Sequence, residues 1–173
     1  MDAREAAMLA LNACQRQGGW SDGALKKQLA AAELSGRDAA LATQLCFGVL
    51  QNQMLLDFYL SKFSNIPLKR MEGKVVQTLR LGAYQMLFLT RIPHSAAVNS
   101  AVTLVKTHCK NPRAAGMVNG ILRSMERSLQ NPLHCFFGDQ WFHLILFLWS
   151  YFDVCKSRCR SAILRSCPIS EGW

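Results

Sequence analysis

Residues 1–132 carry apolar side chains at the spacing of amphipathic helices. In the first stretch they recur at i, i+3, i+4, i+7, i+8 and i+11, which lines one helical face: Ala3, Ala6, Ala7, Ala10, Leu11 and Cys14. Gly18-Gly19 ends this helix, and Ser21 is a suitable N-cap for a second helix. The apolar face of that second helix consists of Leu25, Leu29 and Ala32.

A third helix is expected where Ser35 is followed three residues later by Asp38, the arrangement of a capping box. Its apolar face continues from Leu41 to Phe63, which is long for one straight helix. The sequence therefore predicts a kink, either near Gly48 or at residues 51–53.

Three more apolar stripes follow, at residues 75–87, 98–105 and 114–129, and prolines separate them: Pro67, Pro93 and Pro112. No stretch alternates between apolar and polar residues for long enough to indicate a strand. The pattern predicts an all-α bundle of six or seven helices.

Four glycines fall inside these helical stretches: Gly48, Gly82, Gly116 and Gly120. Each costs about 1 kcal/mol relative to alanine in a helix interior, so some other interaction must offset it. Close approach of a neighbouring helix is the favoured explanation, ahead of contact with a ligand.

The charge of the chain is concentrated in its first part. The 173 residues have a net charge of +9, from 20 Lys+Arg and 11 Asp+Glu. Residues 1–132 hold 16 basic and 8 acidic residues, whereas residues 133–173 hold 4 and 3. A basic excess of this size favours an anionic partner such as nucleic acid or a membrane surface. The composition changes at Asn131-Pro132, so we expect one domain over residues 1–130 and an unassigned aromatic and cysteine-rich tail over 131–173.

Other sequence features favour a cytoplasmic protein. Met1 is followed by charged residues and an amphipathic stretch, which is not typical of a secretory signal. The longest apolar run, Trp141 to Trp149, is about half of the roughly 20 residues that a membrane helix needs. Seven cysteines at irregular spacing fit reduced thiols better than disulfides. We expect no membrane association.

Three segments, in this order and spacing, resemble a known family: Arg80-Leu-Gly-Ala-Tyr-Gln with Pro93, His94-Ser-Ala-Ala-Val-Asn, and Val118-Asn-Gly-Ile-Leu-Arg123. They are similar to NusB-like RNA-binding domains, and most closely to the N-terminal domain of the bacterial 16S rRNA cytosine-C5 methyltransferases of the RsmB, Sun or Fmu type. The resemblance covers roughly residues 2–127. Its characteristic positions are Gly82, Tyr84, Pro93, Asn99, Asn119 and Gly120.

The resemblance implies two packed three-helix subdomains with RNA bound on a basic surface. For the methyltransferase branch it implies an RNA-recognition domain for small-subunit rRNA, ahead of a catalytic domain. The alternative is a stand-alone antitermination factor that binds RNA together with a ribosomal protein. We expect no DNA binding in either case.

The chemistry of a methyltransferase is not visible in this sequence. No Gly-x-Gly loop follows a strand, and Cys167-Pro168 reverses the order of the proline and cysteine that the family's catalytic site uses. Cys155, Cys159 and Cys167 have poor spacing for zinc. We therefore expect no catalytic residues, no metal and no cofactor in this chain, although the family is one of S-adenosylmethionine-dependent enzymes.

The candidate RNA-binding residues are arginines placed where a structural role does not require them: Arg4, Arg16, Arg37, Arg123 and Arg127. Arg4 and Arg16 lie off the apolar face of the first helix, and the resemblance implies RNA contact at its basic start. Arg37 opposes the helix dipole in a first helical turn. Arg123 and Arg127 are like charges at i, i+4, which an anion would stabilise.

Asn99 and Asn119 lie in apolar helical stretches, where we expect each amide to form a hydrogen bond between helices. For residues 133–173 two hypotheses stay open. One is a frameshift that replaced the catalytic domain with an unselected peptide. The other is a genuine partner-binding or membrane-associating extension built on Trp141–Trp149.

Overall fold

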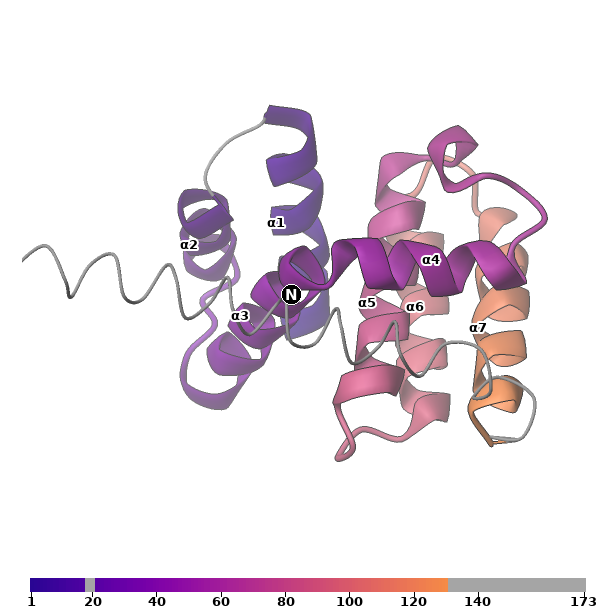
Figure 1. Ribbon diagram of the computed structural model, residues 1–173. Coiled ribbons are helices and arrows are strands. Elements are labelled where there is room, and N and C mark those ends of the chain that lie inside the picture. Colours follow the sequence, from indigo (N-terminus) through magenta and orange to yellow (C-terminus); the bar gives the residue numbers. More distant parts are fainter. Residues whose placement is uncertain (18–20, 131–173) are drawn as a thin grey trace, which may run out of the picture. The chain divides into compact units, whose positions relative to one another are not determined.

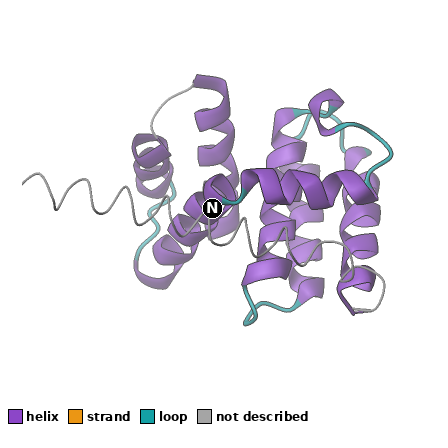
Figure 2. Ribbon diagram, viewed as in Figure 1, coloured by secondary structure: helices purple, strands orange, loops and turns teal. Residues whose placement is uncertain are grey.

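The computed structural model describes residues 1–17 and 21–130. In these residues, the stretches with helical apolar spacing form seven α-helices, and there is one 3₁₀ turn. Along the chain these are α1 (Ala3–Gln17), α2 (Ser21–Ala31), α3 (Gly36–Gln51), α4 (Gln53–Phe63), η1 (Leu68–Arg70), α5 (Gly73–Phe88), α6 (His94–His108) and α7 (Ala114–Gln130). The described part contains no strand (Figures 1 and 2). The prediction of an all-α bundle is confirmed.

The chain divides into two units, Met1–Pro132 and Leu133–Trp173. The second unit lies outside the described residues, and so do Trp141–Trp149, Cys155, Cys159 and Cys167, on which the hypotheses about the tail and a metal site rest. In the described ranges, no helix combines the length and apolarity that crossing a bilayer requires.

The long third helix that the sequence predicts is divided in the structure into two helices, α3 and α4, at Asn52. The backbone of Asn52 leaves the helical region, with φ −105° and ψ 18°. Its side-chain Nδ2 and its backbone N–H both donate to the carbonyl of Gly48, at 2.8 and 3.1 Å, and thereby satisfy the end of α3. The break falls within the residues expected to kink, and the local amide explains why the chain starts a new helix there.

The helices of the first unit form two groups. α1, α2 and α3 pack against one another, while α4, α5, α6 and α7 form the second group (Figure 1). The second group has four helices instead of the three implied by the family resemblance, because α4 is separate from α3. α5 joins the groups, since it packs against α1, α3, α4, α6 and α7.

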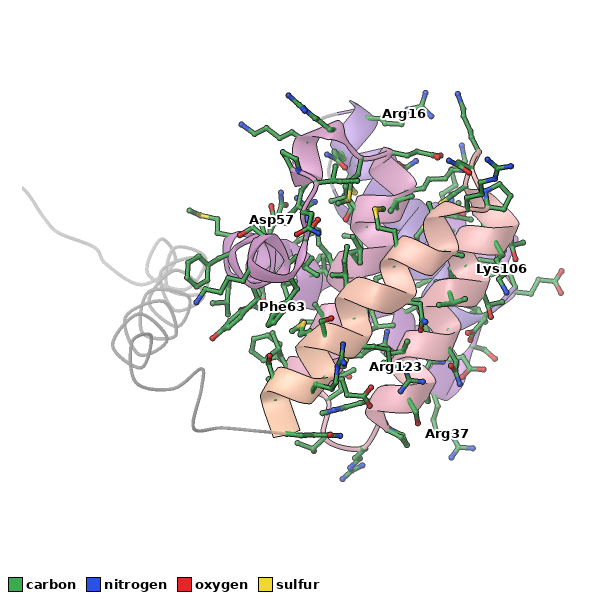
Figure 3. The ribbon with its side chains drawn as sticks, turned by 90° about the vertical axis from the view of Figure 1, so that its right-hand side faces the viewer. Arg16, Arg37, Asp57, Phe63, Lys106 and Arg123 are labelled. Atoms are coloured by element: carbon green, nitrogen blue, oxygen red, sulfur yellow. The ribbon has the colours of Figure 1, made fainter. Side chains whose placement is uncertain are left out.

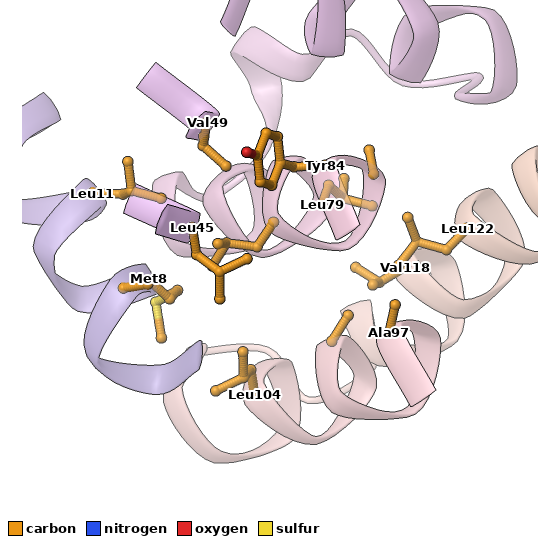
Figure 4. Close-up of a cluster of buried hydrophobic side chains, with 14 of the residues drawn as sticks. Met8, Leu11, Leu45, Val49, Leu79, Tyr84, Ala97, Leu104, Val118 and Leu122 are labelled. Atoms are coloured by element: carbon orange, nitrogen blue, oxygen red, sulfur yellow. The ribbon is translucent and has the colours of Figure 1, made fainter. Parts of the chain in front are cut away.

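A single large apolar core runs through both groups. Figure 4 shows side chains from α1, α3, α5, α6 and α7 converging, among them Met8, Leu11, Leu45, Val49, Leu79, Tyr84, Ala97, Leu104, Val118 and Leu122. Every residue of α5 from Val75 to Met86 is buried. The predicted apolar face of α1 is buried from Ala3 to Leu11, but Met8, which lies off the predicted stripe, is also fully buried.

Burial of α5 includes one charge, the guanidinium of Arg80. Its Nε and Nη2 donate to the two carboxylate oxygens of Asp57 on α4, both at 2.7 Å. The side chain of Arg80 is 7% exposed and that of Asp57 is 33% exposed. This bidentate pair neutralises the buried charge and fixes α4 against α5.

The predicted capping box at Ser35 does not form. Ser35 occupies the N-cap position, but its side chain makes no capping hydrogen bond. The next residue, Gly36, has a φ of +57°, a left-handed conformation that glycine adopts without steric cost. The chain therefore turns between Ser35 and the first helical turn, and the serine hydroxyl is not placed over the free N–H groups.

The four helical glycines fall into two classes. A Cβ on Gly48 would overlap the ring of Tyr84, and a Cβ on Gly82 would lie 2.7 Å from Leu122 Cδ1. Close helix approach explains these two. At Gly116 and Gly120, however, nothing lies within 4 Å of an added Cβ, and both are exposed. For this second pair, the close-packing explanation is wrong.

Alanine substitution of these glycines should separate the two classes. We expect Gly48→Ala to lower the free energy of unfolding by about 1–3 kcal/mol, because the new methyl group overpacks the core against Tyr84. Gly120→Ala should raise it by roughly 0.5–1 kcal/mol, because alanine is the better helix former at an open position. Urea denaturation followed by circular dichroism measures both. Destabilisation by Gly120→Ala would contradict the open surface at this site.

The Arg80–Asp57 ion pair leads to a second prediction. Asp57→Ala should destabilise the protein by about 2–4 kcal/mol, since it leaves a buried guanidinium without its counter-charge. The double variant Asp57→Ala/Arg80→Met should recover a large part of this loss, because no buried charge then remains. Equal loss in the single and double variants would show that packing, and not the charge pair, holds α4 in place.

Candidate nucleic-acid interface

Arg4 lies at the start of α1 and points largely into the protein. Its Nε donates to Oε1 of Gln85 on α5 at 2.8 Å, and one of its terminal nitrogens lies 3.6 Å from the carboxylate of Asp2. Only a fifth of the side chain is exposed. Gln85 is itself buried and donates to the carbonyl of Leu81 at 3.0 Å. Arg4 therefore connects α1 to α5, which sequence reasoning did not foresee.

Arg123 and Arg127 lie together on α7. The side chain of Arg123 is 42% exposed, and its Nη1 donates to Oε2 of Glu126 at 2.8 Å. Arg127 is exposed, and its Nε donates to the backbone carbonyl of Arg123 at 3.3 Å. Their mutual repulsion is reduced because Glu126 lies beside them.

The exposed face of α7 continues from these arginines toward the start of the helix. Gly116, Asn119 and Gly120 are all exposed; Asn119 and Gly120 lie about one turn before Arg123, and Gly116 about two turns before it. The expectation that Asn119 forms a buried hydrogen bond between helices is therefore wrong, and the same holds for Asn99, which is exposed on α6. We call Gly116, Asn119, Gly120, Arg123 and Arg127 the α7 face.

Arg37 and Arg16 do not join the α7 face in one cluster. Both are exposed, Arg37 in the first turn of α3 and Arg16 in the last turn of α1. Figure 3 shows them at opposite ends of the described unit. The five arginines that the sequence singled out thus do not form one cluster, and of these five only Arg123 and Arg127 lie together.

Arg16 instead lies near two cations that sequence reasoning missed, Lys74 and Lys110. The three line a cavity of about 500 Å³, whose other lining residues are Asn12, Gln15, Glu72 and Gly73. Lys74 lies in the first turn of α5, where a cation opposes the helix dipole as Arg37 does in α3. The same argument could therefore have identified Lys74 as a candidate. That α1, α5 and the segment after α6 meet at one place required the fold.

The other positions named by the family resemblance have structural roles. Tyr84 is stacked on Phe88, with ring centroids 5.0 Å apart, and burial raises the pKa of its hydroxyl. Pro93 precedes α6, and its carbonyl accepts from the N–H of Ala97 at 3.1 Å. Gly82 allows α5 and α7 to approach.

Three cysteines fall within the described residues, and none is activated for nucleophilic chemistry. Burial raises the pKa of Cys46 to about 12 and that of Cys109 to about 11, and it also raises the pKa of Cys14. A thiol must ionise to act as a nucleophile, so these three stay protonated at neutral pH.

The acidic side chains are largely engaged within the protein. Asp57 pairs with Arg80, Glu126 with Arg123, and Oε1 of Glu5 lies 2.9 Å from Nε2 of His108. Of the side chains that the structure describes, three acidic ones are exposed: Asp2, Glu33 and Asp38. Twelve basic ones are exposed: Arg16, Lys26, Lys27, Arg37, Lys62, Lys69, Arg70, Arg91, Lys106, Lys110, Arg113 and Arg127. Basic side chains therefore outnumber acidic ones four to one on the exposed surface, against two to one in residues 1–132 as a whole.

Sequence relatives of the chain include proteins named for ribosomal RNA modification. The chain is 39% identical over 124 residues to the probable ribosomal RNA small subunit methyltransferase B of Bacillus subtilis, covering 72% of this chain and 27% of the relative. It is 31% identical over 128 residues to the protein of the same name from Synechocystis, covering 74% and 28%. The matched region thus spans about a quarter of the length of these relatives.

Solved structures share the fold. The NusB chain in the crystal structure of antitermination factors NusB and NusE in complex with dsRNA superposes with a TM-score of 0.66 at 23% identity, covering 73% of this chain and 94% of that one. NusB of T. maritima superposes with a TM-score of 0.67 at 23% identity, covering 72% and 88%.

The family follows from the sequence match and agrees with this fold. Residues 1–127, which are well over half of the chain, match the NusB family profile. The matched residues include all of α1 and extend into the last turns of α7. The chain therefore belongs to the NusB family.

Proposed function

We propose that residues 1–130 form an RNA-recognition domain that binds small-subunit ribosomal RNA. The observation that carries this proposal is the surface charge, with twelve exposed basic side chains against three acidic ones among those described. RNA binding requires such cations, because each phosphate contact releases condensed counterions. Support also comes from relatives named as small-subunit rRNA methyltransferases and from a NusB neighbour crystallised with dsRNA.

The α7 face is the part of this surface best suited to contact the RNA backbone. Arg123 and Arg127 supply guanidinium groups that hydrogen-bond phosphate oxygens, and both are free to reach solvent on one side. Gly116 and Gly120 leave the helix surface bare, so a sugar–phosphate chain can approach the backbone closely. This arrangement gives the two exposed glycines a role that helix packing does not.

The role of the bound domain would be to bring a methyltransferase to its rRNA substrate. Identity to the methyltransferase relatives reaches 39%, against 23% for the NusB of the antitermination complex, which favours this role over that of a stand-alone antitermination factor. A factor of the antitermination type would bind RNA more tightly in the presence of a ribosomal protein. Adding that protein to the binding assay distinguishes the two roles.

RNA binding by the full chain tests the proposal. We expect affinity for small-subunit rRNA fragments to fall steeply with salt in fluorescence anisotropy titrations. In Arg123→Gln/Arg127→Gln, the slope of log K against log salt should become shallower by roughly 1.5, since two phosphate contacts are lost. Lys27→Gln is a suitable control, because it removes an exposed charge from α2, on the opposite side of the unit from α7 (Figure 1).

Two results would count against this function. The absence of salt-sensitive RNA binding by the folded protein would remove the proposal as a whole. An unchanged salt slope in the double arginine variant, with wild-type RNA binding intact, would keep RNA binding but exclude the α7 face as its contact surface.

A further inference from the structure

The cavity beside Arg16 has walls from three separate parts of the chain. Asn12, Gln15 and Arg16 come from the last turns of α1, Glu72, Gly73 and Lys74 from the start of α5, and Lys110 from the segment after α6. Its volume of about 500 Å³ lies within the range of small-ligand sites. Figure 3 shows Arg16 at the end of the unit opposite to Arg37.

The charge of the walls is positive. Arg16, Lys74 and Lys110 contribute three positive charges and Glu72 one negative charge, which leaves a net charge of +2. The carboxylate of Glu72 is occupied by the backbone N–H of Lys110, at 3.1 Å from Oε2. That hydrogen bond holds the Lys110 segment beside the start of α5 and uses part of the acid's capacity as an acceptor.

Lys74 is held at the cavity in a position that helix stability disfavours. Its Nζ donates to the carbonyl of His108 at the end of α6, at 2.9 Å, and this fixes the ammonium group between α5 and α6. A cation in the first turn of a helix opposes the helix dipole, where an acidic residue would be stabilising. An ammonium group has three protons, so two remain for a further partner.

The N-terminus of α5 adds donors to the same cavity. The first helical N–H to bond back along the chain is that of Val76, to the carbonyl of Glu72, and the Glu72 side chain makes no capping bond. Gly73, which lines the cavity, precedes this bond, and a Cβ there would lie 3.2 Å from Oδ1 of Asn12. Glycine thus lets α1 approach while leaving the backbone accessible to an anion.

A buried amide beneath the wall is only partly satisfied. Gln77, 3% exposed and one turn beyond Lys74, donates from Nε2 to Oε1 of Gln15 at 2.8 Å. Its own Oε1 is buried without a hydrogen-bond partner in the described part of the protein. Gln77 does not itself line the cavity, and it supports the wall through its hydrogen bond to Gln15.

We propose that this cavity binds a phosphate group through Arg16, Lys74, Lys110 and the N-terminus of α5. Three cations and free backbone N–H groups match the charge and acceptor geometry of phosphate. The phosphate group would belong either to the RNA backbone or to a free phosphate or nucleotide. The first of these two sources rests on the proposed function. In the first case the cavity is a second anchoring point for RNA, separate from the α7 face.

Inorganic phosphate is the probe for the site itself. Titration of the full chain, followed by NMR or by thermal shift against chloride at equal ionic strength, should show saturable phosphate binding. Arg16→Gln and Lys110→Gln change exposed side chains, so both variants should fold, and each should weaken phosphate binding about tenfold, as expected for loss of one charge-assisted hydrogen bond. Lys106→Gln, an exposed lysine of α6 outside the cavity, should bind phosphate like the wild type.

Binding of rRNA fragments to the same variants identifies the source of the phosphate. A salt slope shallower by about 1.5 in Arg16→Gln/Lys110→Gln assigns the cavity to an RNA phosphodiester. Variant-sensitive phosphate binding with unchanged RNA binding, or with no RNA binding by the wild type, supports the site and assigns it to a free phosphate or nucleotide. Phosphate binding that is absent, or equal in wild type and cavity variants, overturns the proposal and leaves the proposed function standing if RNA still binds.

Discussion

Complete burial of α5 is the constraint on which the rest of the structure depends. A helix enclosed from Val75 to Met86 needs partners for its polar side chains, and among the buried side-chain atoms that the structure describes only Oε1 of Gln77 lacks one. Arg80 pairs with Asp57 of α4, and Gln85 with Arg4 of α1. These pairs are directional, so they determine which helix lies on each side of α5. Apolar packing alone, which tolerates many arrangements, would not specify the positions of α1 and α4 so closely.

Pairing of charged side chains within the protein also affects the composition of its surface. Several acidic side chains are used to satisfy partners inside the protein, whereas most of the basic ones extend into solvent. Arg4 is an exception, because Gln85 draws its guanidinium inward. Of the fifteen exposed charged side chains that the structure describes, twelve are therefore basic. Counting charges along the sequence gives the same net charge, because internal pairs cancel, but it does not show which carboxylates are withdrawn from the surface.

Apolar spacing was sufficient to predict the helices, because each one buries a stripe of side chains against the same core. Features that depend on two distant segments could not be predicted in this way. Gly48 and Gly120 look alike in sequence, yet only the first faces another helix. Asn99 and Asn119 have apolar neighbours in the chain but are exposed. Likewise, Lys74 and Lys110 become partners of Arg16 only when α1, α5 and α6 are placed together.

The bare strip that Gly116 and Gly120 leave on α7 has a thermodynamic consequence for association. A contact surface normally loses rotamer freedom when its side chains are immobilised, at about 0.5–1.5 kcal/mol for each long side chain. The two glycine positions, one turn apart, have no such freedom to lose, and the helix backbone at both is already ordered by its own hydrogen bonds. A partner meeting this strip therefore encounters a surface that is rigid before contact, and the entropic penalty falls mainly on the two neighbouring arginines.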